Sequence, residues 1–180
     1  MPATPPLQTV ITCARLLPFD EALAIGDSAL RADAVTHLEL VEAGDTARGA
    51  GASAVRRVAR HATSRAANPF ESVLRAIAIE VGLDPQPQQP IDVGERIVHP
   101  DLVAGRLALE ADSWEWRTGK QAHVNDRWRY NALVIHGSTV LRFAWEHVML
   151  QPDYVREVLR QAMDGPPTQA EPRRSQRWTA

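Results

Sequence analysis

The first third of the chain follows a pattern of short helices separated by loops of small residues. Residues 1–10 are rich in proline and predict loosely structured chain. Residues 44–53, rich in Gly and small polar residues, predict a loop or a frayed helix start. Apolar and small side chains recur at helical spacing elsewhere in this region. Helices are predicted from Pro18 onward, from an N-cap at Thr36 to Val41, and from Ala54 to Ala62.

The stretch after Asn68 carries strong helix signals. Asn68 is a favourable N-cap, Pro69 suits the first helical position, and Glu71 lies three residues after the cap, as in a capping box. Glu71 therefore has a structural explanation before any catalytic one, and Arg75 is spaced to pair with it. The apolar positions that share one face before Gly82 are Phe70, Val73, Leu74, Ile77 and Val81.

Strand-like patterns follow, interrupted by proline and glycine. Residues 84–93 hold several prolines, which remove ladder donors, so they predict an extended approach to an edge strand. The next strand is predicted over 96–103, and a turn at Gly105 leads into a strand over 106–112. A further strand over 139–144 is β-branched and apolar, as in the interior of a sheet.

Helical patterns surround the last strand. A helix is predicted over 120–136, closed by Gly137, and short helical segments follow at 145–150 and from Pro152. The order of helix, three strands, helix, strand and helix predicts an α/β fold, with a mixed sheet flanked by helices and a helical annex before it. The apolar face of the helix over 120–136 is expected to hold Val124, Trp128, Ala132 and Ile135.

Composition sets the class of the protein without naming a partner. The 180 residues are 44% hydrophobic, enough for one packed domain with an annex, and the net charge of −2 gives no general basic signal. The single cysteine, Cys13, excludes an internal disulfide and favours the cytoplasm, and no apolar run approaches the ~18 residues that span a bilayer. We divide the chain into a helical region over 1–66, an α/β domain over 67–163 and a disordered tail over 164–180.

Three carboxylates stand out within the strand pattern: Asp101, Glu110 and Asp112. On a strand Glu110 and Asp112 point to the same face, and a tight turn at Gly105 would bring Asp101 beside Glu110. Carboxylates held together among apolar residues repel one another unless a cation or a proton intervenes, and their oxygens suit Mg²⁺ or Mn²⁺. We expect the three to converge in a cleft around one cation. The alternative is a β-hairpin with solvated acids on its polar face.

Basic and aromatic residues offer further contacts with nucleic acid, and each group has a structural alternative. A basic run in the annex could contact phosphate or form a solvated face. Two tryptophans after the second predicted strand could stack on bases or pack into the core. The tail could add DNA affinity or only solubility. These groups are Arg56, Arg57, Arg60 and His61; Trp114 and Trp116; and Arg173, Arg174, Arg177 and Trp178.

Several ordered segments resemble the PD-(D/E)XK nuclease superfamily, and within it the very-short-patch-repair-like (Vsr-like) endonuclease domains of actinobacterial type. The resemblance implies a restriction-endonuclease-like fold over 67–163. Residues 11–31 resemble the linker region of AbiEi-antitoxin-like proteins, which makes 1–66 the expected remnant of a longer relative's linker. The matching segments are NPFESVLR (68–75), HPDLV (99–103), LALEAD (107–112), NDRWRYNAL (125–133) and TVLRFAWEHV (139–148).

The resemblance implies a metal site and a reaction. Asp101 and Glu110 would hold Mg²⁺, or Mn²⁺, with the Ala111 carbonyl as a third ligand. Glu71 would reach the metal or its water. The implied chemistry is metal-assisted hydrolysis of a phosphodiester bond, in which the ion lowers the pKa of a bound water and neutralises charge on the phosphate.

Three further residues belong to the implied site. Arg129, and less directly Asp126, would orient the site or a phosphate. Asp112 occupies the place where the general pattern has lysine, and the resembled subfamily commonly has aspartate there. The activating base is therefore not assigned by the pattern.

Departures from the pattern leave more than one function open. Relatives usually show glycine where this chain has Ser113, and a histidine near Arg117, for which His123 is a poorly placed substitute. The leading hypothesis is a metal-dependent DNA endonuclease or nickase that acts on duplex DNA, with no membrane partner and no small-molecule cofactor. The alternatives are a catalytically impaired DNA-binding or antitoxin-like regulator that retains the nuclease fold, and a degraded gene product.

Overall fold

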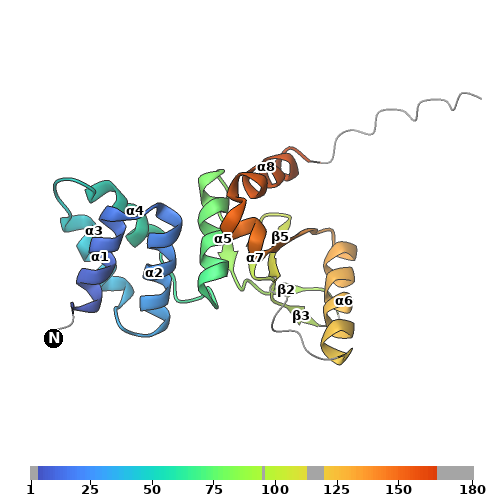
Figure 1. Cartoon of the computed structure of the whole chain (residues 1–180). Helices are drawn as coiled ribbons and strands as arrows, with labels where there is room; N and C mark the ends of the chain where they lie inside the picture. The colour runs from blue at the N-terminus through green and yellow to red at the C-terminus, as the bar shows by residue number, and fades with distance from the viewer. Residues whose placement is uncertain (1–3, 95, 113–119, 166–180) are drawn as a thin grey trace, which may run out of the picture.

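The computed structural model describes residues 4–94, 96–112 and 120–165, with the side chains of 120–123 excepted. Two parts lie side by side in Figure 1: a group of helices, α1 to α4, and a part that begins with α5 and combines helices with strands. The second part contains a small mixed sheet, so the predicted α/β class and the helical annex before it are both confirmed.

The annex contains α1 (Pro6–Leu16), α2 (Phe19–Arg31), α3 (His37–Thr46) and α4 (Ala52–His61). The prediction of loose chain over 1–10 is wrong from Pro6 onward. Proline at the first helical position loses no hydrogen bond, and Val10 and Ala14 are buried in the core that the four helices share. The other helices begin close to the predicted positions.

Helix α3 begins as predicted and ends later than predicted. Thr36 and Glu39 form the capping box, in which each side chain accepts a hydrogen bond from the other residue's backbone N–H. Gly44 belongs to the helix and not to the predicted loop. A Cβ at Gly44 would lie 3.0 Å from the Cβ of Ala59, so the glycine serves the close approach of α3 and α4.

Helix α5 (Pro69–Glu80) has the predicted cap, since the Asn68 side chain accepts a hydrogen bond from the Glu71 N–H. The predicted pairing of Arg75 with Glu71 is wrong. Nη2 of Arg75 donates to both carboxylate oxygens of Asp27 on α2, at 2.9 and 2.8 Å, and the Thr63 N–H donates to the same carboxylate at 2.8 Å. Both charged side chains are buried, with exposed fractions of 5% and 0%, so this ion pair anchors α5 to the annex.

The main sheet has the strand order β1-β4-β5-β6. β1, β4 and β5 pair antiparallel, and β6 pairs parallel to β5. A separate antiparallel pair is formed by β2 and β3. The strands are β1 (Gln86–Pro87), β2 (Ile91–Asp92), β3 (Ile97–Val98), β4 (Leu102–Ala104), β5 (Leu107–Asp112) and β6 (Thr139–Ala144).

The strand predicted over 96–103 is divided between these two sheets. Ile97 and Val98 pair with β2, whereas β4 begins only at Leu102. Pro100 lies in the break, where its missing N–H removes a ladder donor. Asp101 follows this break, directly before β4, and its carbonyl accepts a hydrogen bond from the Gln88 N–H.

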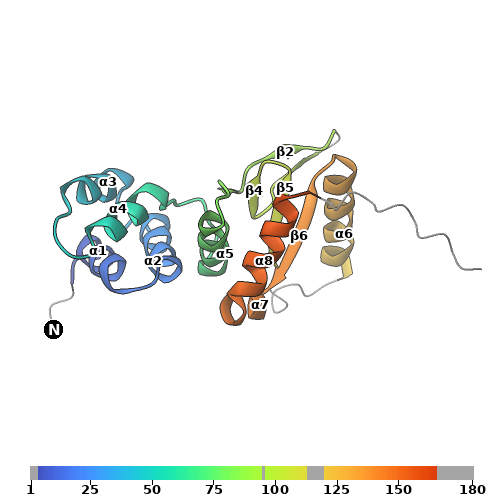
Figure 2. The same ribbon diagram turned by 90° about the horizontal axis from the view of Figure 1, so that it is seen from above.

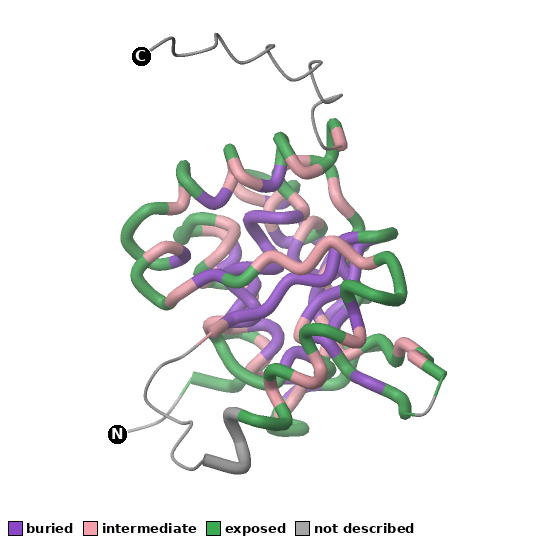
Figure 3. Tube along the Cα trace, turned by 90° about the vertical axis from the view of Figure 1, so that its right-hand side faces the viewer, coloured by how far each residue is buried: buried purple, intermediate pink, exposed green. Residues whose placement is uncertain are grey.

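Helices cover both faces of the main sheet, as Figure 2 shows. One face packs against α5, α7 (Trp145–Leu150) and α8 (Pro152–Met163), and the other packs against α6 (Lys120–Ile135). Buried backbone gathers between these layers in Figure 3. Side chains alternate along β5, so Leu107 and Leu109 face α5 and α8, while Ala108 and Glu110 face α6.

Helix α6 has the predicted length, but only part of its predicted apolar face is covered: Trp128 packs against the core beside Leu133. Val124 and Ile135 are 51% and 87% exposed, whereas Leu133 is buried against the sheet. The sheet face under α6 carries charged side chains from β5 and β6, and the helix turns Asp126 and Arg129 toward them. Complementary charge, and not apolar periodicity alone, sets the rotation of this helix.

The described part of the chain ends at Gly165. The tail predicted over 164–180 lies outside the described residues from 166 onward. In the described ranges no helix combines the length and the apolar character that crossing a membrane requires.

Breaking the Asp27–Arg75 pair should destabilise the whole protein. In Arg75→Met the Asp27 carboxylate stays buried without its guanidinium, which we expect to lower the free energy of unfolding by about 3–5 kcal/mol in urea denaturation. The control is Arg160→Met, because Arg160 pairs with Glu157 at 3.9 Å where both side chains are more than half exposed. It should cost less than about 1 kcal/mol. Equal losses in the two variants would contradict the anchoring role.

Candidate active site

The hairpin of β4 and β5 brings Asp101 to the end of β5. Leu102 pairs with Leu109, so Asp101 lies one register position further along, beside Glu110. Oδ2 of Asp101 accepts a hydrogen bond from the Ala111 N–H at 2.8 Å, which fixes the carboxylate against the strand. The predicted proximity of Asp101 and Glu110 is therefore confirmed by the register.

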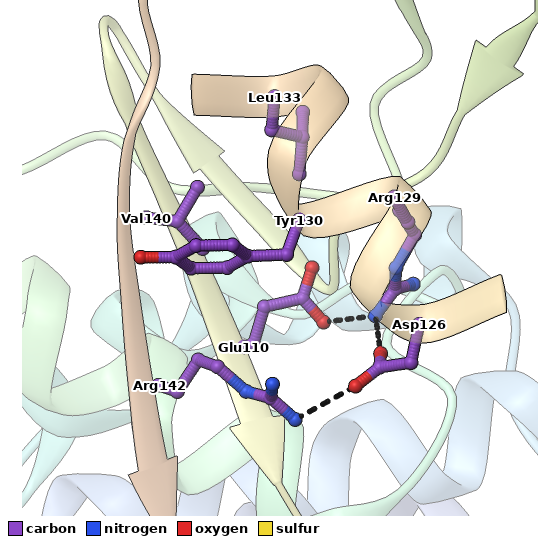
Figure 4. A pocket seen from close by; sticks show the side chains of 7 residues that line it. All are labelled: Glu110, Asp126, Arg129, Tyr130, Leu133, Val140 and Arg142. Carbon is purple, nitrogen blue, oxygen red and sulfur yellow. Dashed lines mark hydrogen bonds and ion pairs between the residues drawn. The ribbon is translucent and has the colours of Figure 1, made fainter. Parts of the chain in front are cut away.

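Glu110 and Asp112 take part in a chain of alternating acids and arginines on the α6 face of the sheet, shown in part in Figure 4. Nη2 of Arg129 lies 2.6 Å from Oε2 of Glu110 and 3.5 Å from Oδ1 of Asp126. Nη2 of Arg142 lies 3.0 Å from Oδ2 of Asp126 and 2.7 Å from Oδ2 of Asp112. We call these five residues the acid–arginine chain.

The acid–arginine chain runs from the protein interior toward solvent. The side chain of Glu110 is 4% exposed and that of its partner Arg129 is 27% exposed. Arg142 and Asp112, at the other end, are each about a third exposed. Burial alone would lower the pKa of Arg142, but the charges of Asp112 and Asp126 outweigh it and raise that pKa. Arg142 thus stays charged. At the outer end of the acid–arginine chain its positive charge is balanced by Asp112 and Asp126.

Glu71 borders this site from α5, where it is held by the helix cap. Its carboxylate accepts hydrogen bonds from the Ala67 N–H at 2.9 Å, from Nδ2 of Asn68 at 2.9 Å and from Nε2 of Gln88 at 3.3 Å. Burial raises the pKa of Glu71, and the negative charge of Asp101 raises it further, against the opposing hydrogen bond from Ala67. The structural explanation of Glu71 is confirmed, and Asp101 is close enough to act on its charge.

Gln88 connects Glu71 to Asp101, and sequence reasoning missed it. Its backbone N–H donates to the Asp101 carbonyl at 3.0 Å, and its side chain donates to Glu71. Its own carbonyl lies 3.2 Å from Nδ1 of His99. Gln88 has a positive φ of 53°, which no local pattern in a proline-rich stretch announces.

Arg142 was also missed, although the sequence held a signal for it. It is the charged residue of an otherwise apolar strand, and it pairs in register with Glu110 on β5. A charge within a buried strand pattern indicates either an edge or a partner on the adjacent strand. The structure assigns it partners, Asp112 and Asp126.

The expectation that Asp101, Glu110 and Asp112 converge around one cation is wrong. Among the described residues no group of three His, Cys, Asp or Glu side chains is arranged to hold a metal ion. The reason is local charge compensation, because Arg142 draws Asp112 outward and Arg129 takes Glu110. The smaller donor set of Asp101, Glu110 and the Ala111 carbonyl is chemically suited to a hard divalent cation, since all its donors are oxygens.

Several predicted contributors cannot be compared with the structure. Ser113, Trp114, Trp116 and Arg117 lie outside the described residues, and so does the side chain of His123. In the basic run of the annex, Arg57 lies over the ring of Phe19, with its Cζ 3.5 Å from the ring centroid, which favours a structural role for this arginine.

Comparison with known proteins finds relatives without an assigned activity. The chain is 34% identical over 158 residues to two proteins of Mycobacterium tuberculosis, from the strains CDC 1551 / Oshkosh and ATCC 25618 / H37Rv, both described as uncharacterized proteins. The match covers 83% of this chain and 57% of each relative, so the chain spans little more than half the length of these relatives. No family model matches the chain. No solved structure matches it either.

The raised pKa of Glu71 predicts a dependence of stability on pH. The folded protein holds this proton more tightly than the unfolded chain does, so the stabilisation it provides is lost as pH rises from about 4.5 through the raised pKa. Glu71→Gln should remove this loss. The free energy of unfolding of the wild type, minus that of the variant, should fall with rising pH across this window in urea titrations.

The matched control is Glu39→Gln in the other helix cap, because a hydrogen bond from the Thr36 backbone lowers the pKa of Glu39 below 4.5. Its wild-type-minus-variant difference should change only below pH 4.5, where it falls as pH falls. A wild-type-minus-Glu71→Gln difference that does not change with pH would contradict the raised pKa of Glu71.

Proposed function

We propose that this protein is a metal-dependent DNA endonuclease or nickase that hydrolyses phosphodiester bonds. The observation that carries the proposal is the hydrogen bond from the Ala111 N–H to Asp101. It fixes the Asp101 carboxylate against Ala111 of β5, the residue after Glu110, and the register places the backbone of Asp101 beside Glu110. Such an oxygen-rich set beside arginines suits a divalent cation and a phosphate together.

The order of elements supports a restriction-endonuclease-like fold. Helix α5 precedes three antiparallel strands of the main sheet, α6 follows them, and β6 then pairs parallel to β5. Helices cover both faces, as expected from the resemblance to PD-(D/E)XK nucleases. Glu110 and Asp112 lie on the α6 side of β5, which supports the proposal.

The residues divide into those that hold the cation and those that act on the phosphate. Asp101, Glu110 and the Ala111 carbonyl would hold Mg²⁺ or Mn²⁺, which would supply Lewis-acid stabilisation and a water of lowered pKa. The Ala111 N–H orients the Asp101 carboxylate. Arg129 adds positive charge beside Glu110 for a phosphate oxygen.

Glu71 and Asp112 take supporting parts in this proposal. Burial raises the pKa of Glu71, so its carboxyl keeps a proton to a higher pH than an ordinary glutamate does, as suits a group that donates a proton. Asp112 pairs with Arg142 and so sets the position of that arginine instead of holding the cation. Duplex DNA is the proposed substrate, and the proposed location is the cytoplasm.

The charge compensation within the site favours one alternative, a DNA-binding regulator that keeps the nuclease fold without cleavage. Both carboxylates on the α6 face of β5 are paired with arginines. A protein of this kind would bind DNA with strong salt dependence and without a requirement for metal.

Nicking of supercoiled plasmid in Mg²⁺, Mn²⁺ or EDTA separates these functions. We expect nicking with either metal and none with EDTA. In Asp101→Asn the nicking rate should fall by about 100-fold or more. The variant keeps the acceptor for the Ala111 N–H but removes the negative charge that would bind the ion. The control Glu157→Gln removes one exposed carboxylate on α8 and should cleave normally.

Two results would overturn the nuclease proposal in different ways. Equal cleavage by the wild type and Asp101→Asn would show that the assigned site is wrong. The absence of cleavage with either metal, together with salt-sensitive and metal-independent gel shifts on the same DNA, would establish the binding alternative.

A further inference from the structure

Arg129 occupies the carboxylate that the proposed function assigns to the cation. Its Nη2 lies 2.6 Å from Oε2 of Glu110, a short charge-assisted contact. Glu110 is nearly completely buried on β5, whereas Arg129 comes from α6 and is partly exposed. Of the two partners, the arginine is therefore the one that is free to move.

The cavity beside this contact is too small to hold a hydrated divalent ion together with the guanidinium of Arg129. The cavity lined by Glu110, Asp126, Arg129 and Arg142 measures about 10 Å³, room for roughly one water molecule. Mg²⁺ usually keeps several of its waters when it binds to protein carboxylates. On the α6 side of Glu110, a hydrated divalent ion therefore has room only when the guanidinium of Arg129 moves away.

The other contacts of Arg129 are weaker than the one with Glu110. Its Nη2 lies 3.5 Å from Asp126, and its Nη1 lies 3.5 Å from the His99 carbonyl. Asp126 keeps a second partner, because Arg142 contacts it at 3.0 Å. Departure of Arg129 would thus leave Asp126 paired, and an incoming cation would replace the lost positive charge on Glu110.

We propose that Arg129 closes the cation site in the ligand-free protein, and that a divalent cation and Arg129 compete for Glu110. When the cation takes Glu110, Arg129 swings out and becomes available to the phosphate of the substrate. The competition weakens cation binding in the absence of DNA. It also couples cation binding to phosphate binding, because the cation takes Glu110 and the phosphate takes Arg129 from the Arg129–Glu110 pair. This inference rests on the proposed role of Glu110 as a cation ligand.

The test measures Mn²⁺ binding without DNA. Binding is quantified by the loss of the electron paramagnetic resonance signal of free Mn²⁺. Arg129→Gln should bind Mn²⁺ roughly 5-fold or more tightly than the wild type, because it removes the competitor. Arg129→Lys keeps the charge and protects the fold, but it lacks the planar fork of arginine, so its affinity should lie between the two. Thermal melts confirm that each variant is folded.

Two controls separate competition from general electrostatics. Arg160→Gln makes the same charge change on α8, where the side chain is exposed, and should leave Mn²⁺ affinity unchanged. Glu110→Gln should abolish saturable binding in the wild-type background and with Arg129→Gln.

Each other outcome has its own meaning. If binding requires Glu110 but neither Arg129 variant binds more tightly than the wild type, the competition is refuted while the proposed metal site stands. If no variant binds Mn²⁺ saturably, the cation role of Glu110 fails, and this inference fails with it. Equal tightening in Arg160→Gln would reduce the effect to net charge and refute the competition.

Discussion

Helix α5 is the element on which both parts of the fold depend, and its buried ion pair with α2 holds it in place. Arg75 satisfies Asp27 where neither charge can reach water, so the annex and the α/β part cannot separate without exposing a costly pair of charges. The same helix places Glu71 at the edge of the candidate site through its N-terminal cap. The annex therefore supports the site at a distance, by fixing the helix from which Glu71 projects.

The site itself is governed by charge compensation between a strand and a helix. Alternation along β5 directs Glu110 to the face that α6 covers, and the buried carboxylate needs a positive partner there. Arg129 is that partner. The proposed cation would meet the same requirement, so the ion pair with Arg129 and the proposed catalysis make opposite demands on one carboxylate.

Local signals were sufficient to predict those features that depend on neighbouring residues. The caps at Thr36 and Asn68 and the position of Asp101 beside Glu110 follow from spacings of a few residues. The Arg75–Asp27 pair joins residues 48 positions apart. No local pattern could therefore predict that Arg75 pairs with Asp27 and not with Glu71. The rotation of α6 was missed for a similar reason, because charges on β5 and β6 decide which of its faces is buried.

The most direct test of a cation site at Asp101 and Glu110 is a crystal structure of the full chain soaked in Mn²⁺, with anomalous diffraction recorded to locate the metal. The account predicts an anomalous peak within coordination distance of both carboxylates and the Ala111 carbonyl, with the Arg129 side chain displaced from Glu110. A crystal soaked in Mn²⁺ that shows no anomalous peak at these residues, and that keeps the Arg129–Glu110 contact, would contradict the cation site.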